Sequence, residues 1–217
     1  MSERERLSRR SILATGAGLA AGAMSLPLGA GPHAPTPANP EGPFYPNRPQ
    51  AETDADLTLI EGHEQRASGE VIRISGRVLD EDGQPVTGAV VDVWQANTHG
   101  RYHHENDPAT APVDPDFQGW AVMKTDAEGR YAFTTIKPGA YRVTGNWSRP
   151  PHIHFRVSRR GFHELTTQMY FAGESLNERD RLLQGVPAGR RDSLVVAFDD
   201  SGAVPRGEFP VVLAKVT

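Results

Sequence analysis

"VIRISGRVLDEDGQPVTGAVVDVW", residues 71–94, is the stretch that decides the fold class. Residues 71–80 alternate between apolar and polar side chains. Because neighbouring residues of a β-strand point to opposite faces, this alternation predicts a strand with one buried face. Residues 81–88, "EDGQPVTG", then supply the Asp, Gly and Pro that favour turns. A second apolar stretch begins at residue 89, so the sequence predicts two strands separated by a turn.

The same pattern recurs along the rest of the chain. A content of 22 Gly and 18 Pro in 217 residues is typical of short strands joined by turns. Only residues 175–186, "SLNERDRLLQGV", predict a helix or helical turn. We therefore expect an all-β domain over residues 71–217, an antiparallel β-sandwich with long loops. Further strands are expected at residues 129–136, 140–145, 152–158, 165–171, 192–199 and 209–216.

Residues 31–70 are predicted to form a proline-rich N-terminal arm. Residues 31–50 contain seven prolines. Proline has no backbone N–H and a fixed φ, so this segment forms neither a helix nor a central strand. A disordered tether is the alternative interpretation. Phe44 and Tyr45, which lie between Gly-Pro and Pro-Asn pairs, favour a segment that wraps the domain.

Residues 1–30 have the layout of a bacterial export signal. The charged start contains Arg9 and Arg10, and an Ala/Gly/Leu-rich stretch follows and runs into Pro27. This order resembles the twin-arginine type of signal, which predicts a periplasmic or extracellular protein. A membrane anchor is the alternative, but the apolar stretch is too short and too rich in glycine for a stable span.

Charge and cysteine content exclude several classes of protein. The formal net charge is −4, without a basic stripe or lysine run, so nucleic acid is not expected as a partner. The chain has no cysteine, which excludes disulfides, zinc ribbons, iron–sulfur clusters and thiol nucleophiles. A metal bound by this chain must therefore use nitrogen and oxygen ligands.

The segment "SRPPHIHF", residues 148–155, contains the first candidate ligands. His152 and His154 are two residues apart in a predicted strand, so they share one face and could bind one metal. The alternative is an ordinary polar strand face. Arg149 and the Pro150-Pro151 pair favour the metal site, because consecutive prolines stiffen the approach to the ligands.

Two tyrosines sit in matching contexts after glycine-containing turns. "HGRY" ends at Tyr102 and "KPGAY" ends at Tyr141. A phenol has a pKa near 10, and binding it as phenolate requires a strongly charged hard cation such as Fe(III). Two tyrosines with two histidines would therefore indicate ferric iron. For either tyrosine alone, a strand-end residue with its hydroxyl in water remains the alternative.

Longer motifs resemble the intradiol ring-cleavage dioxygenases, most closely the iron-bearing beta chains of the protocatechuate 3,4-dioxygenases. Residues 74–107, "ISGRVLDEDGQPVTGAVVDVWQANTHGRYHHEND", reproduce the signature of that family up to its first ligand tyrosine. "DFQGWAVMKTDAEGRYAFTTIKPGAY", residues 116–141, continues it to the second. "RPPHIHFRV", "LTTQMYF" and the N-terminal "TPANPEGPFYP" are similar to further family segments. The resemblance covers residues 36–200.

The resemblance implies an Fe(III) ligand set and two pocket residues. Tyr102 and His152 correspond to the equatorial iron ligands, and Tyr141 and His154 to the axial pair. Tyr141 would leave the iron when the substrate binds and would act as a base. The pocket residues implied by the resemblance are Arg149, which faces the bound catecholate, and Gln168, which lines the same pocket.

The implied activity is the opening of a catechol-type ring between its two hydroxyl-bearing carbons with O2, which gives a cis,cis-muconate. The expected partners are this small molecule and O2, and the sequence leaves open whether the chain forms a homo-oligomer. The sequence departs from the family at residues 142–148, a short loop in which Val143 stands where the protocatechuate enzymes place a tryptophan. That loop borders the substrate in the family, so the ring substituent remains open.

The sequence leaves two other functions open. The stretch at residues 79–94 also resembles prealbumin-like sandwich modules, so an exported, non-catalytic binding module is one alternative. It leaves the tyrosines, histidines, Arg149 and Gln168 unexplained. A zinc hydrolase using the two histidines with Glu105 or Asp107 is the other. The remaining histidines are interpreted as rim or surface residues: His99, His103, His104 and His163.

Overall fold

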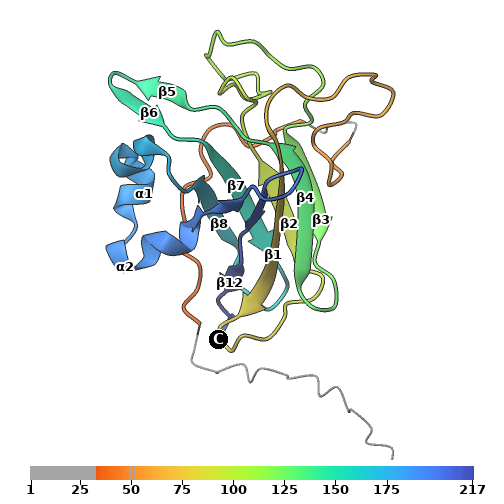
Figure 1. The fold of residues 1–217 in the computed structure, drawn as a ribbon. Coiled ribbons are helices and arrows are strands. Elements are labelled where there is room, and N and C mark those ends of the chain that lie inside the picture. Colours follow the sequence, from red (N-terminus) through yellow and green to blue (C-terminus); the bar gives the residue numbers. More distant parts are fainter. Residues whose placement is uncertain (1–32, 49, 51) are drawn as a thin grey trace, which may run out of the picture.

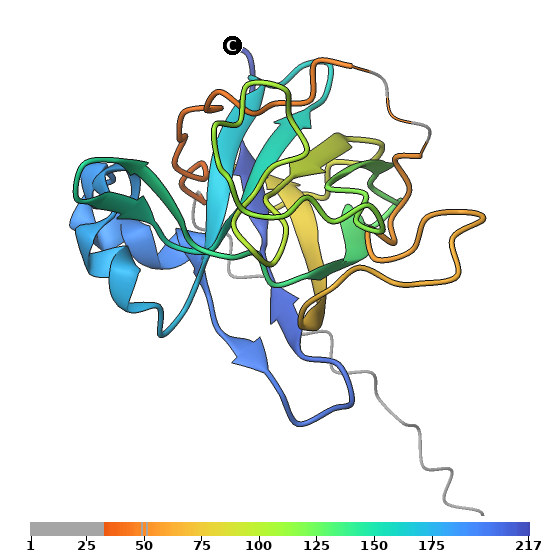
Figure 2. The same cartoon turned by 90° about the horizontal axis from the view of Figure 1, so that it is seen from above.

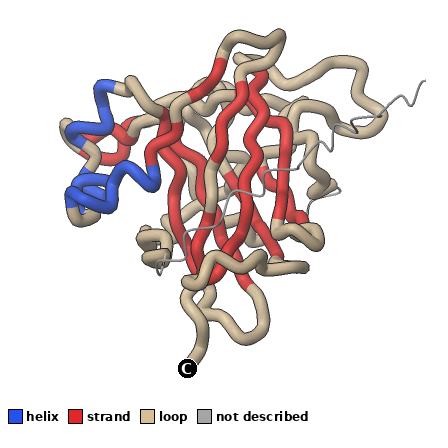
Figure 3. Tube along the Cα trace, turned by 60° about the horizontal axis from the view of Figure 1, so that its bottom comes forward, coloured by secondary structure: helices blue, strands red, loops and turns tan. Residues whose placement is uncertain are grey.

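The computed structural model describes residues 33–48, 50 and 52–217 (Figure 1). The predicted export signal, residues 1–30, lies outside the described residues. Strands are the main regular structure of the described chain, long loops connect them, and the short helices gather on one side (Figure 3). The principal strands are β1 (Val71–Asp80), β2 (Val90–Trp94), β3 (Trp120–Lys124), β4 (Arg130–Ile136), β5 (Tyr141–Thr144), β6 (Trp147–Arg149), β7 (His152–Ser158) and β8 (Leu165–Phe171).

Two sheets face each other across a shared apolar core. One sheet has the order β10-β11-β1-β12 with β4 also paired to β1, and the other has the order β3-β2-β7-β8-β9. The four C-terminal strands in these sheets are short: β9 (Val195–Val196), β10 (Phe198–Asp199), β11 (Arg206–Glu208) and β12 (Val211–Leu213). Ile74 of β1, Val91 of β2 and Phe155 of β7 are fully buried in one cluster. The predicted all-β sandwich is therefore confirmed.

The alternation read from residues 71–80 is present in β1, where every second side chain is buried. The antiparallel prediction holds for the pairs of β1 with β4, β2 with β3 and β7, and β7 with β8. It also holds for β10 with β11, but it is wrong for three pairs: β11 and β12 run parallel to β1, and β9 runs parallel to β8. Such pairs need a crossover connection, and the chain between β8 and β9 passes through the helices.

Two predicted elements are divided in the structure. The strand expected at residues 192–199 is a 3-10 turn, η2 (Asp192–Leu194), followed by β9 and β10, because the chain changes from one sheet to the other there. The helix expected at residues 175–186 consists of η1 (Ser175–Arg179) and α1 (Arg181–Gly185), and α2 (Ala188–Arg191) follows. Within the described part of the chain, no helix has the length and apolar character needed to cross a membrane.

The proline-rich residues 33–48 lie along the sandwich (Figure 2). The backbone N–H of Thr36 donates to Val212 O of β12, and that of Asn39 donates to Thr166 O of β8. Farther along, Tyr45 Oη donates to Asp92 Oδ2 of β2 over 2.8 Å. The segment therefore contacts both sheets, although the domain boundaries after residues 30 and 70 stay predictions.

Candidate metal centre and active site

Strand β7 places His152 and His154 on one face of its sheet, at the start of the strand. β7 lies between β2 and β8, with His154 opposite Trp94 on one side and Gln168 on the other. Each histidine side chain is 2% exposed, so neither forms an ordinary polar surface. The Trp94 ring stacks on the His154 ring with centroids 4.8 Å apart and an interplanar angle of 11°. This stacking fixes the orientation of the His154 ring.

Two glycine turns bring Tyr102 close to Tyr141. Gly100 has φ +75°, and a Cβ at this position would lie 2.4 Å from Ala140 O. A Cβ on Gly139 would similarly lie 2.4 Å from Thr98 O. Only glycine allows the two backbones to approach this closely. The matching turns seen in the sequence therefore hold the two tyrosine loops against each other.

Three buried polar atoms converge. Tyr102 Oη lies 3.4 Å from His152 Nε2 and 3.1 Å from His154 Nε2, and the two Nε2 atoms are 3.2 Å apart. The Tyr141 ring lies beside the same atoms, with its centroid 5.7 Å from that of Tyr102 and 5.7 Å from that of His152. The structure thus brings all four predicted ligands together.

The protonation states of this cluster suit a cation. Burial lowers the pKa of His152 well below its ordinary value, and burial with the charge of Arg149 lowers the pKa of His154 to about 3. Both rings are therefore neutral. His152 Nδ1 donates to Pro150 O over 2.7 Å, so its Nε2 is an unprotonated acceptor. This arrangement is typical of a metal-binding histidine.

The two tyrosines are neutral phenols in the absence of a cation, and one histidine nitrogen of the cluster has no hydrogen-bond partner. Burial raises the pKa of both Tyr102 and Tyr141, so a nearby cation is needed before either ionises at neutral pH. His154 Nδ1 is buried without a hydrogen-bond partner. Among the described residues, no group of three or more His, Cys, Asp and Glu could hold a metal ion. The donor atom nearest to both histidine Nε2 atoms is the Tyr102 hydroxyl. Two phenols and two imidazoles fit Fe(III).

The carboxylates of the zinc interpretation lie elsewhere. Glu105 accepts hydrogen bonds from Asn47 and Arg48 at the surface. Asp107 accepts from the backbone N–H groups of Tyr102 and Ala109 through its two oxygens. Neither carboxylate forms a contact with the histidines. Instead, Asp107 holds the loop that carries Tyr102.

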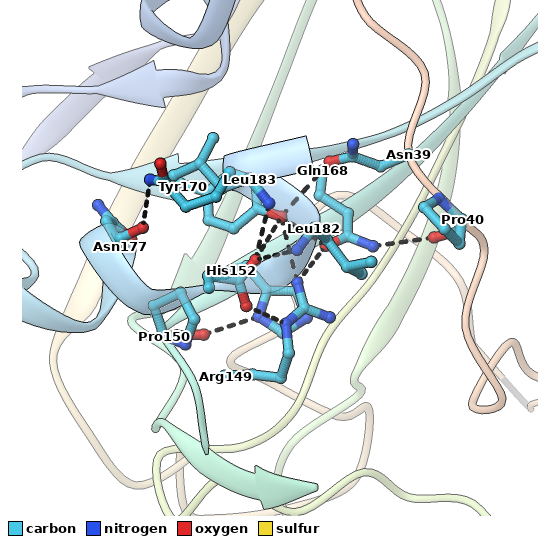
Figure 4. A network of polar contacts seen from close by, with 12 residues as sticks. Asn39, Pro40, Arg149, Pro150, His152, Gln168, Tyr170, Asn177, Leu182 and Leu183 are labelled. Atoms are coloured by element: carbon cyan, nitrogen blue, oxygen red, sulfur yellow. Dashed lines mark hydrogen bonds and ion pairs between the residues drawn. The ribbon is translucent and has the colours of Figure 1, made fainter. Parts of the chain in front are cut away.

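Arg149 and Gln168 form a second buried group beside the histidines (Figure 4). Arg149 is paired with Tyr141 across the β5–β6 hairpin and is 4% exposed. Its Nη2 donates to Gln168 Oε1 and to Tyr170 Oη. Gln168 Nε2 donates in turn to Pro40 O over 2.8 Å, which fixes the orientation of the amide. The predicted pocket residues are therefore in contact with each other.

Sequence reasoning missed three residues of this group. Asp180 accepts from Arg149 Nε over 2.6 Å and is fully buried. Tyr170 lies between Arg149, Gln168 and Asp180, and its Oη is 3.4 Å from Asn39 Oδ1. The only available signal was weak: Asp180 precedes "RLLQG" as a helix N-cap residue would.

A cavity of about 530 Å³ borders the cluster on the side of Tyr102. Its lining includes residues 46–48, the loop at residues 101–105, Phe117 and Gln118. Tyr141, Arg149 and Gln168 do not line it.

Comparison with known proteins gives the class of this molecule. The family model described as "Dioxygenase" matches residues 40–213. The chain belongs to the intradiol dioxygenase family. Among similar proteins, the protocatechuate 3,4-dioxygenase beta chain of Burkholderia cepacia is 45% identical over 180 residues, which cover 79% of this chain and 76% of that protein.

The other similar proteins include two that are named for other catechols. Catechol 1,2-dioxygenase 2 of Acinetobacter lwoffii is 34% identical over 67% of this chain and 54% of its own length, so the present chain spans about half of that protein. The structure of 3-chlorocatechol 1,2-dioxygenase from Rhodococcus opacus 1CP superposes with a TM-score of 0.66 at 25% identity, over 84% of this chain and 74% of that one. The structure of a dioxygenase domain from Streptomyces sp. SirexAA-E superposes with a TM-score of 0.64 at 29% identity. The superposition covers 84% of this chain and 100% of that one.

Proposed function

We propose that this protein is an intradiol dioxygenase that opens a catechol-type ring between its two hydroxyl-bearing carbons with O2, giving a cis,cis-muconate. The observation that carries the proposal is the convergence of Tyr102 Oη, His152 Nε2 and His154 Nε2 within 3.4 Å of one another in a buried site. Membership of the family and the nearby guanidinium of Arg149 support it.

The residues that would hold Fe(III) are Tyr102, Tyr141, His152 and His154. When bound, ferric iron withdraws electron density from a chelated catecholate, so that the ring reacts with O2. The protein supplies an anionic ligand set without carboxylates, a fixed position for each imidazole and a site from which water is largely excluded.

The two tyrosines are held differently, which supports different roles. Tyr102 is 3% exposed, and its backbone N–H donates to Asp107. The Phe44 ring also stacks on it, with centroids 4.7 Å apart. Tyr141 is only partly buried and starts the β5–β6 hairpin, whose residues 142–146 are exposed. Tyr141 is therefore the tyrosine that can move. If a bound metal held it as a phenolate, its oxygen would accept a proton from a catechol hydroxyl on leaving the metal.

Arg149 supplies a fixed positive charge. Burial alone would lower the pKa of Arg149, but its contacts with Tyr170 and Asp180 raise that pKa, so the guanidinium stays charged. Negative charge that builds on the ring during the reaction is stabilised by such a fixed cation in a site with little water. The same charge favours the ionised forms of Tyr102 and Tyr141.

The substrate class is a catechol with a small ring substituent, protocatechuate or a related 3,4-dihydroxy aromatic. The similarity to a protocatechuate enzyme supports this class. Val143, 45% exposed in the hairpin, would leave room at the position where a tryptophan was expected from the family resemblance. Comparing kcat/KM for catechol, protocatechuate and chlorocatechols would rank these substrates.

The test is to supply the iron-loaded protein with each catechol and ¹⁸O₂ and to identify the product by mass spectrometry. A cis,cis-muconate with both oxygen atoms from ¹⁸O₂ is expected. His152→Ala should abolish the product, whereas His163→Ala, which alters an exposed histidine, should not. A protein that binds catechols but consumes no O2 would instead be the non-catalytic binding module.

Export by the twin-arginine route completes the proposal. Its support is the sequence of residues 1–30, with Arg9-Arg10 before a glycine-rich apolar stretch. This route carries folded proteins, so iron would be bound in the cytoplasm before export.

A further inference from the structure

Asp180 lies 31 residues beyond Arg149 and forms a buried ion pair with it. Arg149 Nε donates to Asp180 Oδ2 over 2.6 Å, and the two side chains are 5% and 0% exposed. Asp180 belongs to neither neighbouring helical segment: its backbone is extended, with φ −73° and ψ 117°, between η1 and α1. The family motifs that point to Arg149 do not include it.

The side chain of Arg149 has five N–H groups, and its hydrogen bonds within the protein use three of them. Nε donates to Asp180, and Nη2 donates to Gln168 Oε1 and Tyr170 Oη. Within residues 33–48, 50 and 52–217, Nη1 has no protein partner. The two N–H groups of Nη1 therefore remain for a ligand, while the other three are used to hold the guanidinium.

Both oxygens of Asp180 are engaged. Oδ1 accepts from the backbone N–H groups of Leu182 and Leu183, over 3.1 and 2.9 Å, and so caps α1. Oδ2 accepts from Arg149. Leu183 is 2% exposed and packs into the core, so α1 is anchored. The carboxylate therefore ties the guanidinium to a fixed helix start.

We propose that Asp180 is the positioning residue of Arg149: it sets the angle of the guanidinium so that Nη1 faces the substrate in the ring-opening site. This inference rests on the proposed function of Arg149. Charge-assisted hydrogen bonds are short and directional, and this one acts on Nε, the nitrogen nearest the side-chain stem. It therefore fixes the plane of the whole group.

Asp180→Asn is the informative substitution. An asparagine caps a helix about as well as an aspartate does. It has one side-chain oxygen, however, so it can serve the cap or Arg149 Nε, but not both. The matched control is Leu183→Val, which loosens α1 without touching Arg149. We expect both variants to lower the unfolding temperature, and only Asp180→Asn to impair turnover.

The first readout is steady-state kinetics of the iron-loaded enzyme with its best catechol. Removing an outer partner that orients a functional group typically costs about 10–100-fold in activity, and we expect a loss in this range in kcat with KM within about threefold. Because Asp180 acts through Arg149, Asp180→Asn should add less than about threefold in an Arg149→Ala background. The proposal is overturned if Asp180→Asn lowers kcat as much in the Arg149→Ala background as in the wild type, or if Leu183→Val lowers kcat as much as Asp180→Asn does.

The second readout does not depend on activity or on the stability of a variant. In a crystal structure of the unaltered enzyme soaked anaerobically with 4-nitrocatechol, Nη1 should contact the ligand while Nε stays on Asp180. A ligand held through Nε, or an Arg149 released from Asp180, refutes the inference. If the enzyme opens no catechol ring, the proposed function fails, and ligand-free structures of the unaltered and Asp180→Asn proteins still decide whether Asp180 sets the guanidinium position.

Discussion

Arg149→Ala should destabilise the folded protein much more than the removal of a surface arginine. The substitution removes the partner of Asp180, whose side chain is fully buried and has no other cation beside it in the contacts of the described chain. Breaking a buried pair in this way costs about 3–5 kcal/mol, because one charge is left in a poorly solvated place. For a domain of this size, that loss lowers the unfolding temperature by roughly 6–20 °C.

The double variant provides the internal check. Asp180→Asn in the Arg149→Ala background removes the stranded charge and keeps a helix cap, so it should recover more than half of the lost stability. Arg130→Ala is the control, since Arg130 forms a pair with Asp126 at 2.8 Å on the exposed surface. Thermal unfolding is measured for the iron-loaded wild type, Arg149→Ala, the double variant and Arg130→Ala. A shift below about 2 °C for Arg149→Ala, or a double variant no more stable than the single one, refutes the argument.

Three further predictions concern the tyrosines and the N-terminus. In anaerobic stopped-flow experiments, Tyr141→Phe should retain iron but bind catechol slowly, whereas Tyr102→Phe should change the visible spectrum of the catechol complex. If Tyr141→Phe binds catechol as fast as wild type, the role assigned to Tyr141 is wrong. Burial and a hydrogen bond to a carboxylate raise the pKa of Tyr45 from 10.0 to about 12, so its contribution to stability is present below pH 10 and is lost between pH 10 and 12. Urea unfolding across that range should show a smaller decline for Tyr45→Phe than for wild type, and equal declines would refute this. Replacing Arg9 and Arg10 by lysine should leave folded, active enzyme in the cytoplasm, as cell fractionation would show.

The fold was predictable where the signal was local. The alternation in residues 71–80 is the burial pattern of β1, and the short strands around the Gly and Pro turns follow the same rule. The parallel pairing of β11 and β12 with β1 was not predictable, because more than a hundred residues separate the partners and the apolar pattern does not encode strand direction. The helix or helical turn expected at residues 175–186 is divided at Asp180, where the capping side chain starts a second segment.

The candidate site was predictable to the extent that its residues carry motifs. His152 and His154 share a face because of their spacing, and the turns before Tyr102 and Tyr141 contain glycines that the close backbone approach requires. The orientation of Arg149 was not predictable, because Asp180 reaches it only through the folded chain. A short-range pattern cannot show that one carboxylate both caps a helix and binds a distant guanidinium.

The central claim is that two tyrosines and two histidines hold Fe(III) and present it to a catechol. Its most direct test is the visible spectrum of natively purified protein of known metal content, recorded before and after anaerobic addition of one equivalent of catechol. We predict about one iron per chain, a phenolate-to-iron charge-transfer band that gives a red-brown colour, and a shift of that band when catechol binds. Stoichiometric zinc with no visible band, or an iron band that catechol leaves unchanged, would contradict the claim.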